Sequence, residues 1–310
     1  METPIVKVEH LSHKYHVNWA IRDMNFEIRQ KGILGLLGSN GAGKSTTMNI
    51  ICGVLRQTQG RVYINGTDSG DNPILAKSCL GFLPQKPPLY TDLTVDEYLT
   101  YTAELRSVPP KKIKKAVSTA KEKCGIGHFS KRIIKNLSGG YQQRLGIAQA
   151  IIHNPGFVVL DEPTNGLDPN QIVEIRRLIK EIAEERSVML STHILSEVQA
   201  TCDHIKMIES GRLVFSGTMG EFNNYIRPDT LTTYMKNPPD IEVLEKIPGI
   251  SKVEKIDRMH FRMHFDGDEE ITGRIINAAV AGNWEIREIT VEKISADTIF
   301  ARLSGKKTPF

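Results

Sequence analysis

Residues 38–45 read Gly-Ser-Asn-Gly-Ala-Gly-Lys-Ser and directly follow a short apolar run, Ile33 to Leu37. An apolar run of this length bounded by glycine is typical of a buried strand, and Lys44 to Leu55 has the pattern of a helix. A glycine-rich loop between a strand and a helix turns its backbone N–H groups toward an anion at the positive end of the helix. The stretch therefore predicts a phosphate-binding loop in an α/β fold. The alternative, a plain glycine-rich turn with a surface lysine, leaves unexplained why every fixed position of the pattern is filled.

The chemistry of this loop assigns a role to each residue type. Glycines let the backbone approach the phosphates closely. The Lys44 ammonium group is expected at the β- and γ-phosphates of a nucleotide, and the Ser45 hydroxyl at Mg²⁺. The residues expected to bind the nucleotide here are Gly38, Asn40, Gly41, Gly43, Lys44, Ser45 and Thr46.

Polar residues also follow three further strand-like runs. Asp161 and Glu162 follow Phe157 to Leu160, and Gln85 and His193 each end a run of their own. The carboxyl ends of parallel strands lie at the edge of a sheet where ligands bind. There Asp161 is expected to hold Mg²⁺, directly or through water, and Glu162 to act as a general base. Taken singly, the acidic pair is better explained as a plain strand-end charge, a glutamine after a strand is more often merely exposed, and a lone histidine is usually structural.

A second helix start follows Leu137. Ser138 has the character of an N-cap, and Gly139 and Gly140 open a helix predicted to run to about Asn154. Such a start is a second place where an anion could bind. A well-capped helix without a ligand is the alternative.

Composition limits the class of protein. The chain has 310 residues and a net charge of only +4, which predicts no nucleic-acid partner. Its four cysteines form no CxxC pair, which argues against zinc or a disulfide framework and fits a reducing cytosol. No apolar run approaches the roughly 20 residues needed to cross a bilayer. The basic cluster at residues 111–115 is interpreted as a solvated helix face.

The pattern along the chain predicts two domains. Residues 93–153 are largely helical, whereas residues 157–215 alternate strand and helix, the arrangement of a parallel sheet. A linker is expected at Ile226–Asp229. Beyond it the predicted order is strand, helix, strand, strand, helix, strand, as in ferredoxin-like domains, and then a last helix at 294–303. The expected bounds are 1–226, with a helical subdomain at about 86–155, and 228–310.

The order of these motifs resembles the ATP-binding subunit of an ABC transporter over roughly residues 4–220. The resemblance rests on the loop, Gln85, Leu137 to Gln143, Phe157 to Asp168, and His193. It implies a P-loop ATPase core with a mainly parallel sheet and an inserted helical subdomain, followed by the small α+β domain. One position departs from the common signature sequence: Tyr141 stands where glutamine is usual.

The resemblance also implies residue roles. Gln85 would reach Mg²⁺ and the attacking water, and His193 would contact the γ-phosphate. Tyr15 would stack on adenine, with ordinary packing in a turn as the alternative, and Asp168 belongs to the segment that approaches the nucleotide. A further set, Ser138, Gly139 and Gly140, would bind the γ-phosphate of ATP held by a second copy of the chain.

Finer similarity to drug-resistance and gliding-motility exporters comes from residues 146–155, 166–171 and 294–303. The expected function is that of a cytoplasmic ATPase subunit that binds ATP and Mg²⁺ and forms a dimer with a second ATPase subunit, most simply its own copy. It would sit peripherally at the inner face of the membrane and drive a permease on a separate chain. The alternatives are a soluble ABC ATPase acting on ribosomes or DNA, and an importer subunit.

Overall fold

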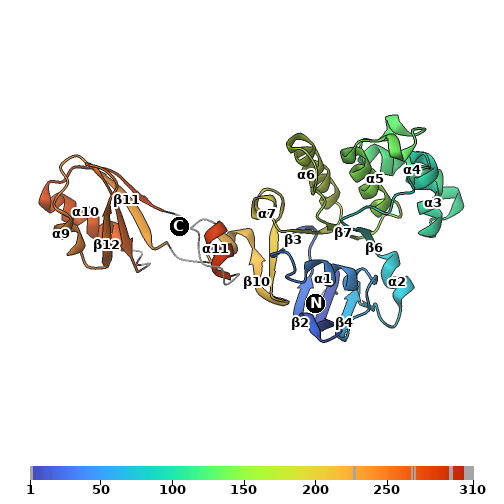
Figure 1. Ribbon diagram of the computed structural model, residues 1–310, viewed down its shortest axis with the longest axis horizontal. Helices are drawn as coiled ribbons and strands as arrows, with labels where there is room; N and C mark the ends of the chain where they lie inside the picture. Colours follow the sequence, from blue (N-terminus) through green and yellow to red (C-terminus); the bar gives the residue numbers. More distant parts are fainter. Residues whose placement is uncertain (1–2, 226–227, 267, 269, 293–295, 304–310) are drawn as a thin grey trace. The chain divides into compact units, whose positions relative to one another are not determined.

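The computed structural model describes residues 3–225, 228–266, 268, 270–292 and 296–303. The chain divides into two compact units, Met1–Met219 and Gly220–Phe310 (Figure 1). Half of the linker expected at Ile226–Asp229 lies outside the described residues.

A six-stranded sheet forms the centre of the first unit, in the order β10-β9-β3-β8-β7-β6. All neighbours are parallel except the pair β9 and β10, so the predicted mainly parallel sheet is confirmed. The strands are β3 (Gly32–Leu37), β6 (Leu80–Leu83), β7 (Phe157–Asp161), β8 (Ser187–Thr192), β9 (His204–Glu209) and β10 (Arg212–Thr218). The apolar residues of β3, β7, β8 and β9 are almost fully buried because helices pack against this sheet, namely α5 (Gly139–Ile151), α6 (Pro169–Ala183) and α7 (Leu195–Thr201).

A separate antiparallel sheet has the order β2-β1-β4-β5. Its strands are β1 (Val6–Tyr15), β2 (Asn18–Ile28), β4 (Gln59–Ile64) and β5 (Thr67–Asp68), followed by α2 (Pro73–Ser78). The strand pattern of this region was predicted, but not its separation from the parallel sheet. Sequence periodicity shows which side of a strand is buried and not which strand it pairs with.

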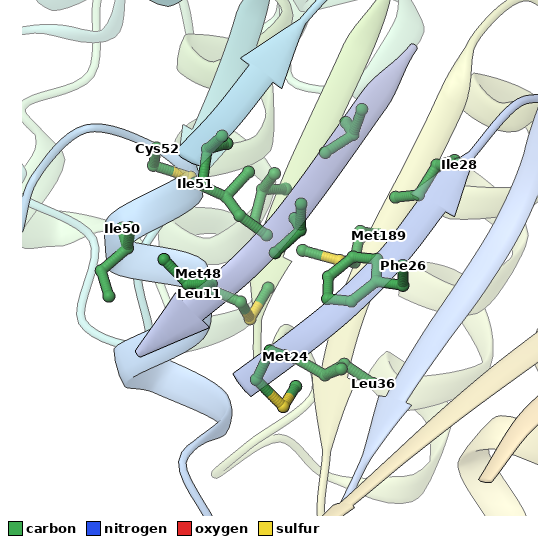
Figure 2. Close-up of a cluster of buried hydrophobic side chains, with 14 of the residues drawn as sticks. Leu11, Met24, Phe26, Ile28, Leu36, Met48, Ile50, Ile51, Cys52 and Met189 are labelled. Carbon is green, nitrogen blue, oxygen red and sulfur yellow. The ribbon is translucent and has the colours of Figure 1, made fainter. Parts of the chain in front are cut away.

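Helix α1 (Lys44–Ile51) packs in the core between the two sheets (Figure 2). Met48 and Ile51 of the helix belong to one buried cluster with Met24 from the antiparallel sheet and Leu36 and Met189 from the parallel one. Burying a side chain of this size contributes about 1.5–3 kcal/mol. This packing holds the N-terminus of α1, and with it the phosphate loop, at the carboxyl end of β3.

The helical subdomain consists of α3 (Val95–Leu105) and α4 (Pro110–Lys123), which pack on each other and on α5. Helix α3 begins with a capping box: the Thr94 hydroxyl accepts from the Glu97 backbone N–H, and the Glu97 carboxylate accepts from the Thr94 backbone N–H. Helix α5 links these helices to the sheet, because it also contacts β6 and β7.

The second unit has the predicted ferredoxin-like order. After α8 (Met219–Asn223) come β11 (Thr230–Met235), α9 (Ile241–Glu245), β12 (Ile250–Lys255), β13 (His260–Phe265), α10 (Ile271–Gly282), β14 (Ile286–Val291) and α11 (Ala296–Leu303). The sheet is antiparallel with the order β12-β13-β11-β14, around a core that includes Leu231, Phe261 and Ile275. The predicted starts of the last two helices, 269 and 294–295, fall outside the described residues.

Candidate functional site: a phosphate-loop cleft

The phosphate loop joins β3 to α1, as predicted. Gly41 and Gly43 have φ of 83° and 110°, a region that favours glycine. A Cβ on Gly38 would lie 2.3 Å from the backbone oxygen of Ile208. The glycines are therefore required by the backbone path itself.

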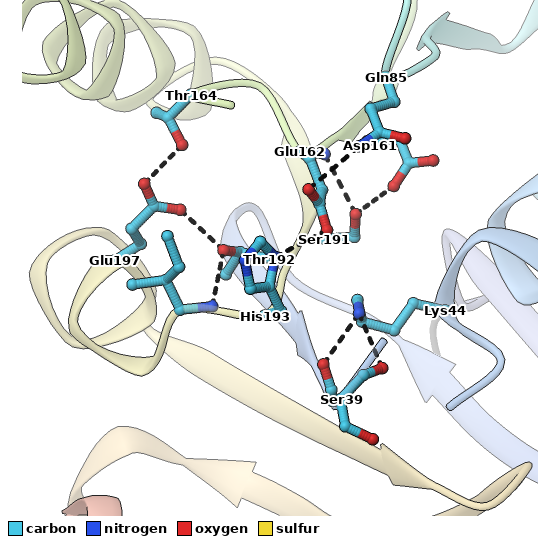
Figure 3. A network of polar contacts seen from close by, with 12 residues as sticks. Ser39, Lys44, Gln85, Asp161, Glu162, Thr164, Ser191, Thr192, His193 and Glu197 are labelled. Atoms are coloured by element: carbon cyan, nitrogen blue, oxygen red, sulfur yellow. Dashed lines mark hydrogen bonds and ion pairs between the residues drawn. The ribbon is translucent and has the colours of Figure 1, made fainter. Parts of the chain in front are cut away.

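Lys44 lies inside this loop. Its side chain is 5% exposed, and its Nζ donates to the backbone oxygens of Gly38 at 2.8 Å and Ser39 at 3.2 Å (Figure 3). Burial lowers the pKa of Lys44, while the carboxylates of Glu162 and Asp161 act in the opposite direction. The loop thus holds a buried cation with acceptor groups of its own backbone.

Glu162 brings together residues from the ends of three neighbouring strands. Its Oε2 accepts from Gln85 Nε2 at 3.3 Å, and its Oε1 accepts from His193 Nδ1 at 3.0 Å (Figure 3). Glu162 has a left-handed backbone, with φ of 45°, and its backbone N–H donates to the Ser191 backbone oxygen at 3.2 Å. The three residues expected at one edge of the sheet from separate motifs do meet there.

Asp161 lies behind this group. It is 6% exposed, and its carboxylate accepts a hydrogen bond from the Ser191 hydroxyl. The same hydroxyl oxygen accepts from the Glu162 backbone N–H at 3.2 Å. Ser191 therefore ties the two acidic residues together.

A cleft of about 430 Å³ opens over the loop. Its lining contains nine residues predicted for the site together with Ala20 and Asn165, which sequence reasoning missed: Ala20, Asn40, Gly41, Gly43, Lys44, Ser45, Thr46, Gln85, Glu162, Asn165 and His193. The sequence did offer a reason to consider Asn165, because it stands three residues after Glu162. In the structure its backbone N–H donates to the Glu162 backbone oxygen at 3.1 Å.

Several predicted residues do not line this cleft. Tyr15 is 49% exposed, with its ring edge-on to His13 at 4.7 Å between centroids. Asp168 caps α6, where its carboxylate accepts from the Gln171 backbone N–H at 3.0 Å. The signature residues also lie outside the lining.

The start of α5 presents polar groups that the described chain does not use. Ser138 occupies the N-cap position as predicted, but its side chain is exposed and makes no capping hydrogen bond. Gly139 has open space around it, whereas a Cβ on Gly140 would lie 2.8 Å from the Gln171 amide carbon. Exposed N–H groups and a free hydroxyl at a helix start are suited to an anion brought from outside.

Two links between motifs were not foreseen. Gln143 of α5 donates from Nε2 to the Pro163 backbone oxygen at 2.8 Å, which connects the signature helix to the segment after Glu162. Glu197, which is 6% exposed, accepts from the Thr164 hydroxyl at 2.5 Å and the Thr192 hydroxyl at 2.7 Å. Gln143 and Pro163 are 20 positions apart, and Thr164 and Glu197 are 33 apart, so no local pattern in the sequence indicates these two contacts.

Comparison with known proteins agrees with this geometry. The family model for ABC transporters matches residues 21–165. The bacitracin transport ATP-binding protein BcrA of Bacillus licheniformis is 30% identical over 313 residues, which cover 98% of each chain. The chain belongs to the ABC transporter family. It is an ATP-binding subunit of this family and hydrolyses ATP.

Two further ABC proteins are similar. The linearmycin resistance ATP-binding protein LnrL of Bacillus subtilis (strain 168) is 26% identical over 97% of this chain and 99% of its own. The structure of cbiO1 from Clostridium perfringens, part of the ABC transporter complex cbiONQ, is 29% identical with a TM-score of 0.64 and covers 70% of this chain and 89% of its own. In the part of the chain that the structure describes, no helix combines the length and apolar character needed to span a bilayer.

Proposed function

We propose that this ABC ATPase is the energy-supplying subunit of an exporter and drives a permease carried on a separate chain. Two relatives that align with nearly all of the chain are named for bacitracin transport and linearmycin resistance, which supports export of a small molecule. The observation that carries the catalytic part is Glu162, held between Gln85 and His193 in the cleft that also contains Lys44.

The chain's own residues suit hydrolysis of a nucleotide triphosphate. Lys44 would offset the charge of the β- and γ-phosphates, and the loop N–H groups would bind their oxygens. The Glu162 carboxylate would take a proton from the attacking water as the bond to the leaving diphosphate breaks. His193, whose other ring nitrogen is not used by Glu162, would contact the γ-phosphate.

The predicted metal ligands fit Mg²⁺. They are the Ser45 hydroxyl, the Gln85 amide oxygen and the Asp161 carboxylate, all hard oxygen donors. No group of three or more His, Cys, Asp or Glu side chains suited to a metal occurs among the described residues, and a site with few protein ligands plus phosphates is typical of Mg²⁺. When bound, Mg²⁺ would withdraw charge from the phosphates. Asp161 would hold the ion directly or through water.

A second subunit would complete the site. The signature residues lie outside the phosphate-loop cleft, while Ser138 and Gly139 are exposed and open. They would bind the γ-phosphate of ATP held by a partner, most simply a second copy. The dimer would lie at the inner face of the membrane, with residues 86–106 against the permease. Residues 220–310 would act as an accessory domain, since they hold none of the motifs.

Replacing the loop lysine tests the nucleotide site. Lys44→Ala should abolish binding of MgATP measured by calorimetry, because a buried charge aimed at the phosphates is lost. Lys131→Ala, at an exposed position outside the cleft, is the matched control. An unchanged affinity of Lys44→Ala for MgATP would contradict the assignment of the nucleotide site.

Purification from membranes tests the transport role. The tagged chain should bring down a multi-helix membrane protein after gentle solubilisation. Recovery with ribosomes or DNA would instead support the alternative that the chain is a soluble ABC ATPase. Substrate accumulation on the cytoplasmic side during ATP hydrolysis would contradict export and support the alternative of an importer subunit.

A further inference from the structure

Another cavity, of about 480 Å³, lies at the amino end of β3, the strand whose carboxyl end leads into the phosphate loop. Its lining comes mainly from the end of β2, the start of β3 and the strands β9 and β10, so it lies where the antiparallel sheet meets the parallel sheet. The six residues of β3 separate it from the phosphate loop by roughly 20 Å. It shares no lining residue with the nucleotide cleft, and its volume is within the range of about 300–1,000 Å³ that is usual for small-molecule sites.

Lys206 of β9 is buried in the wall of this cavity. The residue is 7% exposed, its Nζ donates to the Ser216 hydroxyl at 2.7 Å, and the same nitrogen lies 5.2 Å from the centre of the Phe26 ring. Side chains alternate along a strand, so Lys206 points to the same side of β9 as Ile208, a member of the apolar cluster between the sheets (Figure 2). The ammonium group therefore lies beside an apolar core.

This ammonium group has no carboxylate partner. Lys206 makes no ion pair with any residue that the structure describes, and burial alone lowers its pKa. Among the described residues that line the cavity, Glu27 is the only acidic one, and its carboxylate pairs with Arg29 at 2.5 Å. The carboxylate of Asp203 accepts from the Ile33 backbone N–H at 2.9 Å. A buried ammonium group without a counterion costs folding free energy, and a bound anion would offset that cost.

The rest of the lining combines apolar surface with access from solvent. Phe26, Leu34 and Leu213 supply apolar side chains from β2, β3 and β10. Lys31 and Ser216 also line the cavity and are exposed, so the cavity is open to solvent on their side. A positive group in a concave, partly apolar site attracts an anion more strongly than the same group on an open surface.

We propose that this cavity binds a small organic anion, with its carboxylate or sulfonate group on the Lys206 ammonium group and its apolar part against Phe26 and Leu213. The ammonium group has three N–H donors, of which Ser216 takes one, so two can serve the oxygens of an anionic head. An inorganic anion would leave the apolar walls uncovered, and a hydrocarbon would leave the ammonium group unpaired. A ligand with both parts matches the whole lining.

A fluorescence titration with 8-anilinonaphthalene-1-sulfonate, an aromatic anion, tests the site. The wild-type chain should bind this probe, and Lys206→Met should weaken binding by about tenfold or more, because methionine keeps the apolar stem and removes the charge-assisted contact. Lys31→Met removes the same charge from the exposed rim and should weaken binding by less than about threefold. Thermal unfolding should show Lys206→Met to be at least as stable as wild type, because a buried unpaired charge is lost.

Competition separates the charge of the ligand from its apolar part. Octanoate should displace the probe from the wild-type chain, whereas 1-octanol, which has the same chain length and no charge, should not do so at the same concentration. Equal displacement by the two compounds would show that the cavity selects only apolar groups, which would overturn the proposal.

Amine labelling locates the ligand without any substitution. Octanoate should slow acetylation of Lys206 by acetic anhydride about threefold or more, because the bound carboxylate covers the amine. Acetylation of the exposed Lys14, which does not line the cavity, should keep its rate. Mass spectrometry of the digested chain measures both. Equal rates at Lys206 with and without octanoate would contradict the placement of the anion.

This proposal can fail separately from the proposed ATPase function. Lys206→Met should bind MgATP as wild type does, because Lys206 does not line the nucleotide cleft, and Lys44→Ala should keep its affinity for the aromatic probe. Absence of probe binding to the wild-type chain, equal binding by wild type and Lys206→Met, or loss of binding in Lys44→Ala would each overturn the proposal.

Discussion

At the scale of single residues, Glu162 shows how this site is assembled. Its carboxylate accepts hydrogen bonds from Gln85 and His193, which lie 77 and 31 positions away in the sequence. Both hydrogen bonds orient the carboxylate, as a base for water requires. The role of Glu162 stays a prediction, and one substitution tests it.

Glu162→Gln should retain MgATP binding but lose roughly 10²–10⁴-fold in turnover, because the amide keeps the shape and cannot take a proton. Phosphate release measures turnover, and size-exclusion chromatography with MgATP should show a trapped dimer. Glu181→Gln, which alters an exposed i,i+4 ion pair with Arg177, should leave both readouts unchanged. Hydrolysis by Glu162→Gln at the wild-type rate contradicts the assignment.

His153 makes folding stability depend on pH. Its Nε2 donates to the Leu80 backbone oxygen at 3.0 Å, and burial lowers its pKa from 6.5 to about 4. The unfolded chain therefore takes up a proton at a higher pH than the folded chain does. The stability that the neutral ring contributes is fully present above pH 6.5 and is lost as the pH falls through about 4.

Urea unfolding at several pH values measures this contribution. Between pH 6.5 and pH 4 the wild type should lose about 1–3 kcal/mol that His153→Gln does not lose. The variant starts from a lower stability at pH 7, so the comparison is between slopes. Parallel curves for the two proteins would contradict the buried neutral state of His153.

At the scale of elements, α5 approaches β6 so closely that only glycine fits between them. A Cβ on Gly81 would lie 1.9 Å from the Ala150 backbone oxygen. The contact joins the signature helix to the strand that leads to Gln85, so the helical subdomain and the cleft share one packing interface.

Gly81→Ala should destabilise the first unit by about 1–3 kcal/mol or more, because backbone atoms must move to admit a methyl group. Gly156→Ala is the matched control, since a Cβ there meets no atom within 4 Å and the position precedes the neighbouring β7. Chemical unfolding compares the two variants with wild type. Equal stability of both variants would show that the helix and strand lie farther apart.

At the scale of the whole molecule, one chain holds one phosphate loop and one signature, and the signature residues do not line the cleft over the loop in the described part of the chain. We therefore expect a loop from one copy and a signature from another to enclose one ATP. Gly139→Asp places a carboxylate at the open start of α5 without disturbing the monomer, whereas the same change at Gly140 would press on Gln171.

Mixing tests this arrangement. Gly139→Asp and Lys44→Ala should each be inactive alone. In a mixed dimer both lesions fall on one composite site, and the other site is intact, so some ATPase activity should return. If each loop worked with its own signature, every site would carry one lesion. Activity that stays at baseline with subunit exchange confirmed would exclude sites shared between copies.

Local patterns in the sequence determined much of this protein. The glycine-rich loop between a strand and a helix predicted the phosphate-binding site. Together with the polar residues that follow apolar runs, it predicted the parallel sheet and nine of the residues that line the cleft. Alternation and turns predicted the order of the C-terminal unit. These features follow from neighbouring residues, because periodicity and backbone freedom are local properties.

Only the tertiary structure decided how distant segments meet. It separated the N-terminal strands into a sheet of their own, used Asp168 as a helix cap, and placed Gly140 against Gln171. It also gathered Phe26, Lys206 and Ser216 around one cavity. Such contacts depend on long-range packing. The free energy that favours them comes from burial across the whole fold, so no single position in the sequence predicts them.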